Sequence, residues 1–274
     1  MESTALIDFS HFTSHIDSIV SIDQFRKAVG LENDNNLFDV IKVIPEICLV
    51  GFNDSVYRYH DWRANIDAFY KSFKPTKHTI IFAGRAPLGM LLYAGSKTSH
   101  YDVNPFEQIF DVVNHFPKDG NLVSWRISNI KPGDAASHVS FNCESVFQHE
   151  HGSIRPKYLV FCITTFNKLS ETNATSIRNE LNDPFADIFE IYPSMNDKQL
   201  EVTQDNVFGI VHEIHEHVRR TYNDLKYKDS ARIAMSFAGP ASLAFLVGMT
   251  VQNQNVFGDM TFLNYRNQKY EVCA

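Results

Sequence analysis

The stretch FAGRAPLGMLLYAG runs from Phe82 to Gly95, and the stretch FAGPASLAFLVG runs from Phe237 to Gly248. Each begins with Phe-Ala-Gly, continues with small residues and a proline, and then becomes an apolar run. This order is typical of a strand that ends at a glycine turn and leads directly into a helix. Because the two opening phenylalanines lie 155 positions apart, the sequence predicts an internal repeat.

The surroundings of the two phrases repeat as well. Short apolar runs with the character of buried strands alternate with helical patterns, and each half closes with a further strand-like run. The expected strands are 5–12, 38–46, 78–84 and 99–108 in the first half, and 159–166, 185–194, 232–239 and 258–267 in the second. The expected helices are 21–30, 63–73 and 85–95, then 175–183, 206–225 and 240–248.

Strands that alternate with helices imply parallel sheets built from right-handed crossovers. We therefore expect an α/β fold with two Rossmann-like halves, residues 1–108 and 158–274, that form a pseudo-dimer within one chain. The rival interpretation is two βα units within a single larger sheet. Between the halves, residues 109–157 carry WRISN and HVSFNCES around IKPGDAAS. This pattern predicts a connecting segment with a β-hairpin that has a long Pro-Gly turn.

Composition narrows the possible functions. The formal net charge is −7, with 25 basic and 32 acidic residues, which argues against a protein that coats DNA or RNA. It leaves room for a small anionic ligand held by a few local groups. The four cysteines are far apart and form no CxxC pair, so we expect neither a disulfide framework nor a zinc site. With no signal-peptide pattern and no long apolar run, a cytoplasmic setting is expected.

The residues of the repeated phrase suit a site that binds an anion. Pro87 and Pro240 fall near the first turn of each expected helix, where a missing N–H has no cost. A strand that stops at a glycine before such a helix presents backbone N–H groups and the positive helix end, which suits a phosphate. Packing alone also requires glycine at many tight strand-to-helix turns. The phrase is neither a P-loop nor the GxGxxG fingerprint.

The two phrases, and above all FAGPASLAFLVGMTVQNQNVFGDMTFLNY, resemble the core signature of the SAVED domain family, in which two CARF-like halves are fused. The resemblance covers the whole chain as an architecture, but only the two phrases match at motif level. It implies a sensor of a cyclic oligonucleotide second messenger, of the cyclic tri- or tetra-adenylate type, in CBASS or type III CRISPR antiphage defence. The ligand would bind between the halves and trigger oligomerisation or a conformational change.

Relatives in this family usually carry a fused effector, and the repeat here fills the chain. We therefore expect a separate effector protein or a sensor module cut from a longer chain, without direct binding to polymeric DNA or to membranes. The resemblance also implies which residues contact the ligand, in four groups. These are Ser10, His11 and Phe12; Gly84, Arg85 and Ala86; Thr164, Thr165 and Phe166; and Gly239, Pro240, Ala241 and Ser242. For Phe12 and Phe166, core packing is the alternative to base stacking.

No catalytic, metal or cofactor site is expected. HEIHEH, from His212 to His217, lacks the second histidine of HExxH because position 216 is glutamate. We expect His212 and His215 to lie on a solvated face of a helix. Two enzymatic alternatives stay open: a ring nuclease that cleaves its own ligand using Ser10, His11, Arg85 and Thr165, and a nucleotide-metabolising α/β enzyme.

Overall fold

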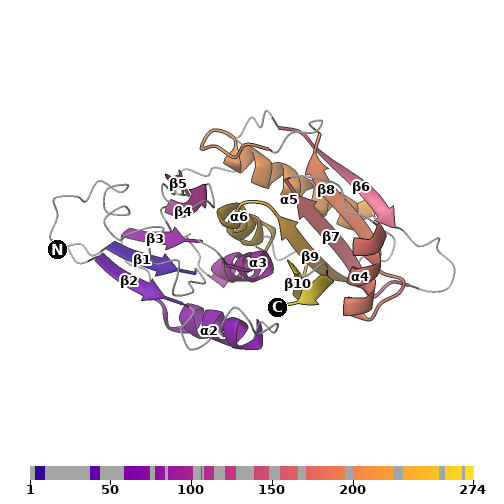
Figure 1. The fold of residues 1–274 in the computed structure, drawn as a ribbon, viewed down its shortest axis with the longest axis horizontal. Coiled ribbons are helices and arrows are strands. Elements are labelled where there is room, and N and C mark those ends of the chain that lie inside the picture. The colour runs from indigo at the N-terminus through magenta and orange to yellow at the C-terminus, as the bar shows by residue number, and fades with distance from the viewer. Residues whose placement is uncertain are drawn as a thin grey trace. The chain divides into compact units, whose positions relative to one another are not determined.

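The computed structural model shows a mixed α/β fold that divides into two compact units (Figure 1). Unit 1 comprises Met1–Ala86 and His100–Ile130, and unit 2 comprises Pro87–Ser99 and Lys131–Ala274. The structure describes residues 4–9, 38–43, 59–74, 78–83, 86–100, 106, 108–113, 121–127, 139–147, 155–165, 171–194, 200–224, 231–252, 257–266 and 269–274. The division into 1–108, 109–157 and 158–274 stays a prediction.

Unit 1 is built on a five-stranded sheet with the strand order β2-β1-β3-β4-β5. Its strands are β1 (Thr4–Asp8), β2 (Phe38–Lys42), β3 (His78–Phe82), β4 (Gln108–Val113) and β5 (Asn121–Arg126). The first four are parallel, and β5 is antiparallel to β4. Helix α2 (Tyr59–Ser72) packs its aromatic residues on this sheet, and the Phe69 ring meets the Phe9 ring edge-on at 5.9 Å between centroids.

Unit 2 is built on a six-stranded sheet with the strand order β11-β10-β9-β7-β8-β6. Its strands are β6 (Phe141–Phe147), β7 (Tyr158–Thr164), β8 (Asp187–Pro193), β9 (Arg232–Ala238), β10 (Met260–Arg266) and β11 (Lys269–Val272). Strands β7 to β10 are parallel, whereas β6 and β11 pair antiparallel at the two edges. The long apolar runs of β7 and β8 are almost fully buried, as expected for parallel strands covered on both faces.

Four helices cover the sheet of unit 2. They are α3 (Leu88–Ser96), α4 (Glu171–Leu181), α5 (Val207–Asp224) and α6 (Ala241–Gln252). Helix α4 lies on one face, where Ala174 and Ile177 join a cluster with Val160 and Leu263 (Figure 1). Helices α3, α5 and α6 pack together on the other face.

The internal repeat is confirmed by the topology. The order β2-β1-β3-β4-β5 of the first sheet recurs as β8-β7-β9-β10-β11 in the second. Even the register agrees, because Thr4 pairs with His78 and Tyr158 pairs with Arg232, each 74 positions apart. The rival interpretation of a single larger sheet is wrong, since the described strands form two sheets. The helix expected at 21–30 lies outside the described residues.

The predicted pairing of WRISN with HVSFNCES is wrong. The first run supplies β5, which pairs with β4, and the second supplies β6, which pairs with β8 in the other sheet. The middle segment does contain an antiparallel hairpin, but β4 and β5 form it. Alternating apolar and polar residues predict a strand without specifying its neighbour, and each of these strands lies at a sheet edge.

The helices of the two repeated phrases contact each other within unit 2. A Cβ atom added at Gly95 would overlap the Phe245 carbonyl, and one added at Gly248 would overlap the Leu92 carbonyl. Gly95 and Gly248 differ by 153 positions, and so do Leu92 and Phe245. The α3–α6 contact is therefore isologous: equivalent residues of the two copies meet through reciprocal contacts, as in a twofold dimer.

Candidate functional site

The candidate site lies where the parallel strands β7 and β9 of unit 2 end. Thr164 is paired with Ala238, so the loops after both strands leave the sheet side by side. The next residue, Thr165, donates its backbone N–H to the Ala238 carbonyl at 2.9 Å, and its hydroxyl lies 3.4 Å from the same oxygen. The structure thus brings Thr164 and Thr165 together with the start of the second repeated turn, as the sequence predicts.

A glycine is required at position 239 by this close approach. A Cβ atom there would lie 2.7 Å from Thr165 Oγ1 and 2.9 Å from Cε1 of Phe237. After the turn, the Pro240 carbonyl accepts the N–H of Ala244 at 3.1 Å and so begins α6. The first N–H groups of an α-helix have no intrahelical acceptor, which leaves those of residues 241–243 directed out of the helix.

Burial decides which atoms of the turn a ligand can reach. The side chains of Thr165 and Ser242 are fully buried, and Thr164 is 7% exposed. Gly239, Pro240 and Ala241 are half-buried. A ligand at this edge would therefore meet the backbone of the turn before any of the three hydroxyls. The ligand contacts of all these residues stay predictions.

The first copy of the turn is described only from Ala86 onward. Ala86 is half-buried and precedes Pro87, whose carbonyl accepts the N–H groups of Met90 and Leu91 at 2.9 and 3.1 Å. Both prolines therefore cap their helices in the same way. Six of the expected contact residues lie outside the described residues: Ser10, His11, Phe12, Gly84, Arg85 and Phe166.

Sequence analysis missed an exposed aromatic residue at the same edge. Strand β10 runs parallel to β9, and their pairing ends at Leu263 with Ser236, so that Tyr265 follows this last pair by two residues, as Ala238 does on β9 before the Gly239 turn. Tyr265 is 48% exposed. The run YRNQKY, with aromatic residues and cations around a turn, is the signal in the sequence that could have indicated it.

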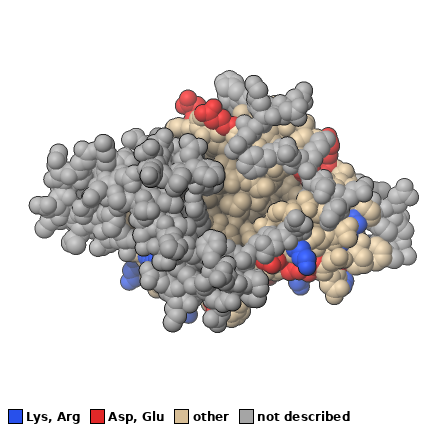
Figure 2. Space-filling model, viewed as in Figure 1, with Lys and Arg blue, Asp and Glu red and all other residues tan. Residues whose placement is uncertain are grey.

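On the face drawn in Figure 2, the visible Lys and Arg side chains of the described residues stand apart from one another. Among the described residues, no helix is long and apolar enough to cross a membrane.

Three solved structures of one receptor resemble this chain over 99% of its length. They are Acinetobacter baumannii Cap4, a receptor that contains a SAVED/CARF domain, with the cyclic trinucleotide 3'3'3'-cAAA (TM-score 0.57, 10% identity), with 2'3'3'-cAAA (TM-score 0.60, 8% identity), and without a named ligand (TM-score 0.52, 9% identity). This chain has a SAVED-like fold. It spans about half of the receptor, 51%, 51% and 49% respectively. No protein-family model and no curated protein sequence matches it.

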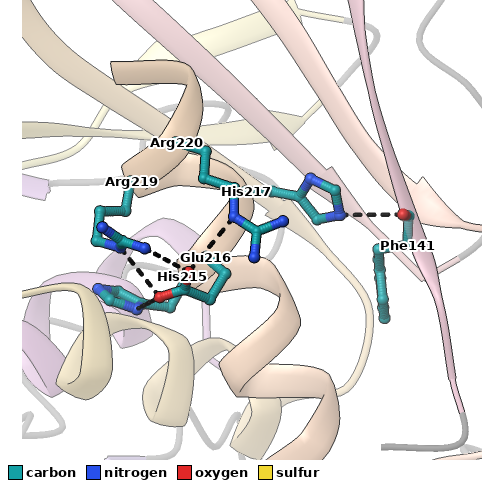
Figure 3. A network of polar contacts seen from close by, with 6 residues as sticks. All are labelled: Phe141, His215, Glu216, His217, Arg219 and Arg220. Carbon is teal, nitrogen blue, oxygen red and sulfur yellow. Dashed lines mark hydrogen bonds and ion pairs between the residues drawn. The ribbon is translucent and has the colours of Figure 1, made fainter. Parts of the chain in front are cut away.

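Within this fold, helix α5 carries a network of polar contacts (Figure 3). Glu216 accepts two hydrogen bonds from Arg219, at 3.0 and 2.6 Å, and lies 3.5 Å from Arg220. The guanidinium of Arg219 lowers the pKa of the Glu216 carboxyl. His217 Nε2 lies 3.0 Å from the Phe141 carbonyl and so links α5 to β6.

The expectation that His215 lies on a solvated face is wrong, whereas His212 is exposed as expected. His215 is only 3% exposed, and burial lowers its pKa. The reason is helical spacing: position 215 is one turn from Val211 and Val218, at the border of an apolar stripe wide enough to include it. Among the described residues, no group of His, Cys, Asp and Glu could hold a metal ion.

Proposed function

We propose that this chain is a sensor of a cyclic oligonucleotide, of the cyclic tri- or tetra-adenylate type, in bacterial antiphage defence. The observation that carries the proposal is the Gly239 turn, where the backbone N–H groups that begin α6 follow the carboxyl end of a parallel strand. Such a helix start favours anions, and crevices outside the carboxyl ends of strands are where open α/β sheets bind ligands. The solved neighbours with cyclic trinucleotides support this ligand class.

The sensor acts by a shift between two states. Ligand binding favours one of them, and the chain then self-assembles or changes conformation and activates an effector protein in CBASS or type III CRISPR defence. The proposed setting is the cytoplasm, because a cyclic oligonucleotide messenger is made and sensed inside the cell.

A thermal-shift screen tests the ligand class. The panel contains 3'3'3'-cAAA, 2'3'3'-cAAA, a cyclic di-adenylate and a cyclic tetra-adenylate, together with AMP and NAD. A ligand present at a hundred times its Kd stabilises the folded state by about 2.7 kcal/mol, which a melting curve detects readily. We expect a shift with a cyclic tri- or tetranucleotide and none with AMP or NAD. A flat response to all cyclic compounds refutes the proposal, and a shift with AMP or NAD alone favours a nucleotide-metabolising enzyme.

The site is tested with Arg85→Glu, the cation beside the first turn. This substitution should abolish binding while it changes the free energy of unfolding by less than about 1 kcal/mol, as for a typical surface position. The matched control is Arg232→Glu, because Arg232 is exposed at the amino end of β9, the end of that strand opposite the Gly239 turn. Wild-type affinity in Arg85→Glu contradicts this placement of the site. Chromatography of the ligand after long incubation then separates a sensor, which returns it intact, from a ring nuclease.

A further inference from the structure

The tip of the β10–β11 hairpin presents an aromatic side chain at the edge of the sheet where the Gly239 turn begins. Among the described residues, Tyr265 and Val272 are the large apolar side chains that are clearly exposed, at 48% and 41%. They differ in position along the strands. Tyr265 lies two residues beyond Leu263, whose partner Ser236 is two residues before the end of β9, whereas Val272 pairs with Leu263 itself in the body of the sheet. Of the two, Tyr265 is therefore the one near the carboxyl ends of the parallel strands.

A buried neighbour holds the exposed ring in place. Tyr265 pairs across the hairpin with Tyr270, and the two rings lie 5.0 Å apart between centroids. Tyr270 is 7% exposed and shares a hydrogen bond with the Ser236 side chain, while its backbone N–H is bound by Ser176 Oγ of α4 at 3.0 Å. Tyr265 thus lies against a buried aromatic residue, while about half of its surface, 48%, is exposed. An ordered ring loses little conformational freedom when a ligand packs on it.

A cation lies at the tip of the same hairpin. Lys269, whose backbone pairs with that of residue 266 across the turn, is exposed. It precedes Tyr270 directly and so places a positive charge near the two aromatic residues. Exposed aromatic rings with nearby cations are the combination by which proteins bind unpaired nucleotides: bases stack on the rings, and phosphates meet the positive charge.

We propose that Tyr265 is a stacking platform for one base of the cyclic oligonucleotide, with the tip of the β10–β11 hairpin as the wall of the site next to the Gly239 turn. This inference rests on the proposed function, since it assigns a base-binding residue to the same ligand. It identifies a contact through a base, whereas the backbone of the turn meets phosphate. The tip of the hairpin would then let the site discriminate a cyclic oligonucleotide, which has bases, from inorganic phosphate, which has none.

Binding of cyclic tri-adenylate to three variants tests the proposal. Titration calorimetry should show affinity at least about tenfold weaker for Tyr265→Ala, because base–aromatic stacking contributes on that scale. Tyr265→Phe, which keeps the ring, should stay close to wild type. Val272→Ala is the matched control, since it truncates the other exposed apolar side chain of the hairpin away from the edge. Melting temperatures of the free proteins establish that all three variants are folded.

A second readout reports stacking itself. In a cyclic trinucleotide with one adenine replaced by 2-aminopurine, stacking on Tyr265 should quench the fluorescence further on binding, and Tyr265→Ala should lose that part of the quenching. Unchanged affinity and quenching in Tyr265→Ala overturn the inference and leave the proposed function standing. Unchanged affinity with loss of self-association overturns it in favour of a contact between copies of the chain. If wild-type protein binds no cyclic oligonucleotide, both the proposed function and this inference fail.

Discussion

Substituting Gly248 by alanine should change the stability of the protein through two effects of opposite sign. Alanine is the better helix former, so at an open position in a helix the exchange stabilises a protein by about 1 kcal/mol. In α6, however, the new Cβ atom would lie 2.8 Å from the carbonyl carbon and 2.9 Å from Cα of Leu92, besides overlapping its carbonyl oxygen. These neighbours are backbone atoms of α3, so a change of side-chain rotamer cannot relieve the clash.

The expected magnitude follows from these distances. Carbon atoms in contact lie about 3.5–4.0 Å apart, so the two helices must separate by roughly 1 Å. Overpacking of a core costs about 1–3 kcal/mol, and a clash with backbone falls at the upper end. With an unfolding entropy of about 2.1 cal/mol/K per residue, a loss of about 3 kcal/mol in a chain of 274 residues lowers the melting temperature by roughly 5 °C.

Thermal unfolding followed by circular dichroism measures the effect. Gly95→Ala should cost a similar amount, because its Cβ atom would lie 2.9 Å from Met249 N and 3.0 Å from the Phe245 carbonyl carbon in the reciprocal contact. The double variant should lose less than the sum, since one separation of the helices relieves both clashes. Asn179→Ala, at an exposed position of α4, controls for helix propensity. A melting temperature of Gly248→Ala at or above that of wild type would refute the close contact.

Two further predictions concern the dependence of stability on pH and the effect of a larger side chain in the Gly239 turn. Because burial lowers the pKa of His215, the unfolded chain takes up a proton near its ordinary pKa of about 6.5 while the folded chain does not; stability is therefore lost as the pH falls from 7.5 to 5.5. In urea denaturation measured at several pH values, His215→Leu should lose less stability between pH 7.5 and 5.5 than wild type does. His212→Gln, at an exposed position, should keep the wild-type dependence of the free energy of unfolding on pH. The same dependence in all three proteins would contradict the burial of His215. Gly239→Val should lower stability by about 1–3 kcal/mol and weaken ligand binding, because the side chains of Thr165 and Phe237 must move; a soluble variant with normal affinity would remove the case for a tight turn.

The sequence predicted the parts of the fold that depend on local patterns. The buried runs of β7 and β8 and the apolar stripe of α5 have periods that specify a strand or a helix directly. The repeat then supported the order of elements, because equivalent patterns recur in the second half at spacings that range from 148 positions between Pro45 and Pro193 to 155 between Phe82 and Phe237. The second copy of the turn was placed at the correct edge for the same reason.

What the sequence did not predict depends on neighbours distant in the chain. Strand β5 pairs with β4 and strand β6 with β8, and the alternation of apolar and polar residues in each strand does not specify these partners. His215 lies at the border of the apolar stripe, where only the packed neighbours decide between exposure and burial. Tyr265 lay within a recognised strand, but its importance comes from the level at which β10 ends beside β9, which is a property of the sheet.

In the two copies of the phrase, the number of residues between the strand end and the helix contact differs. This difference bears on why the chain repeats the phrase. The strand ends, Phe82 and Phe237, differ by 155 positions, whereas the glycines of the helix contact, Gly95 and Gly248, differ by 153. The first copy of the phrase therefore has two more residues between its phenylalanine and its helix glycine, and it is the copy that contains Arg85. An isologous contact requires equivalent helices, because each surface must fit the other, but it sets no such condition on the turns that precede them. The helices explain why the phrase is repeated, and the turns were free to diverge.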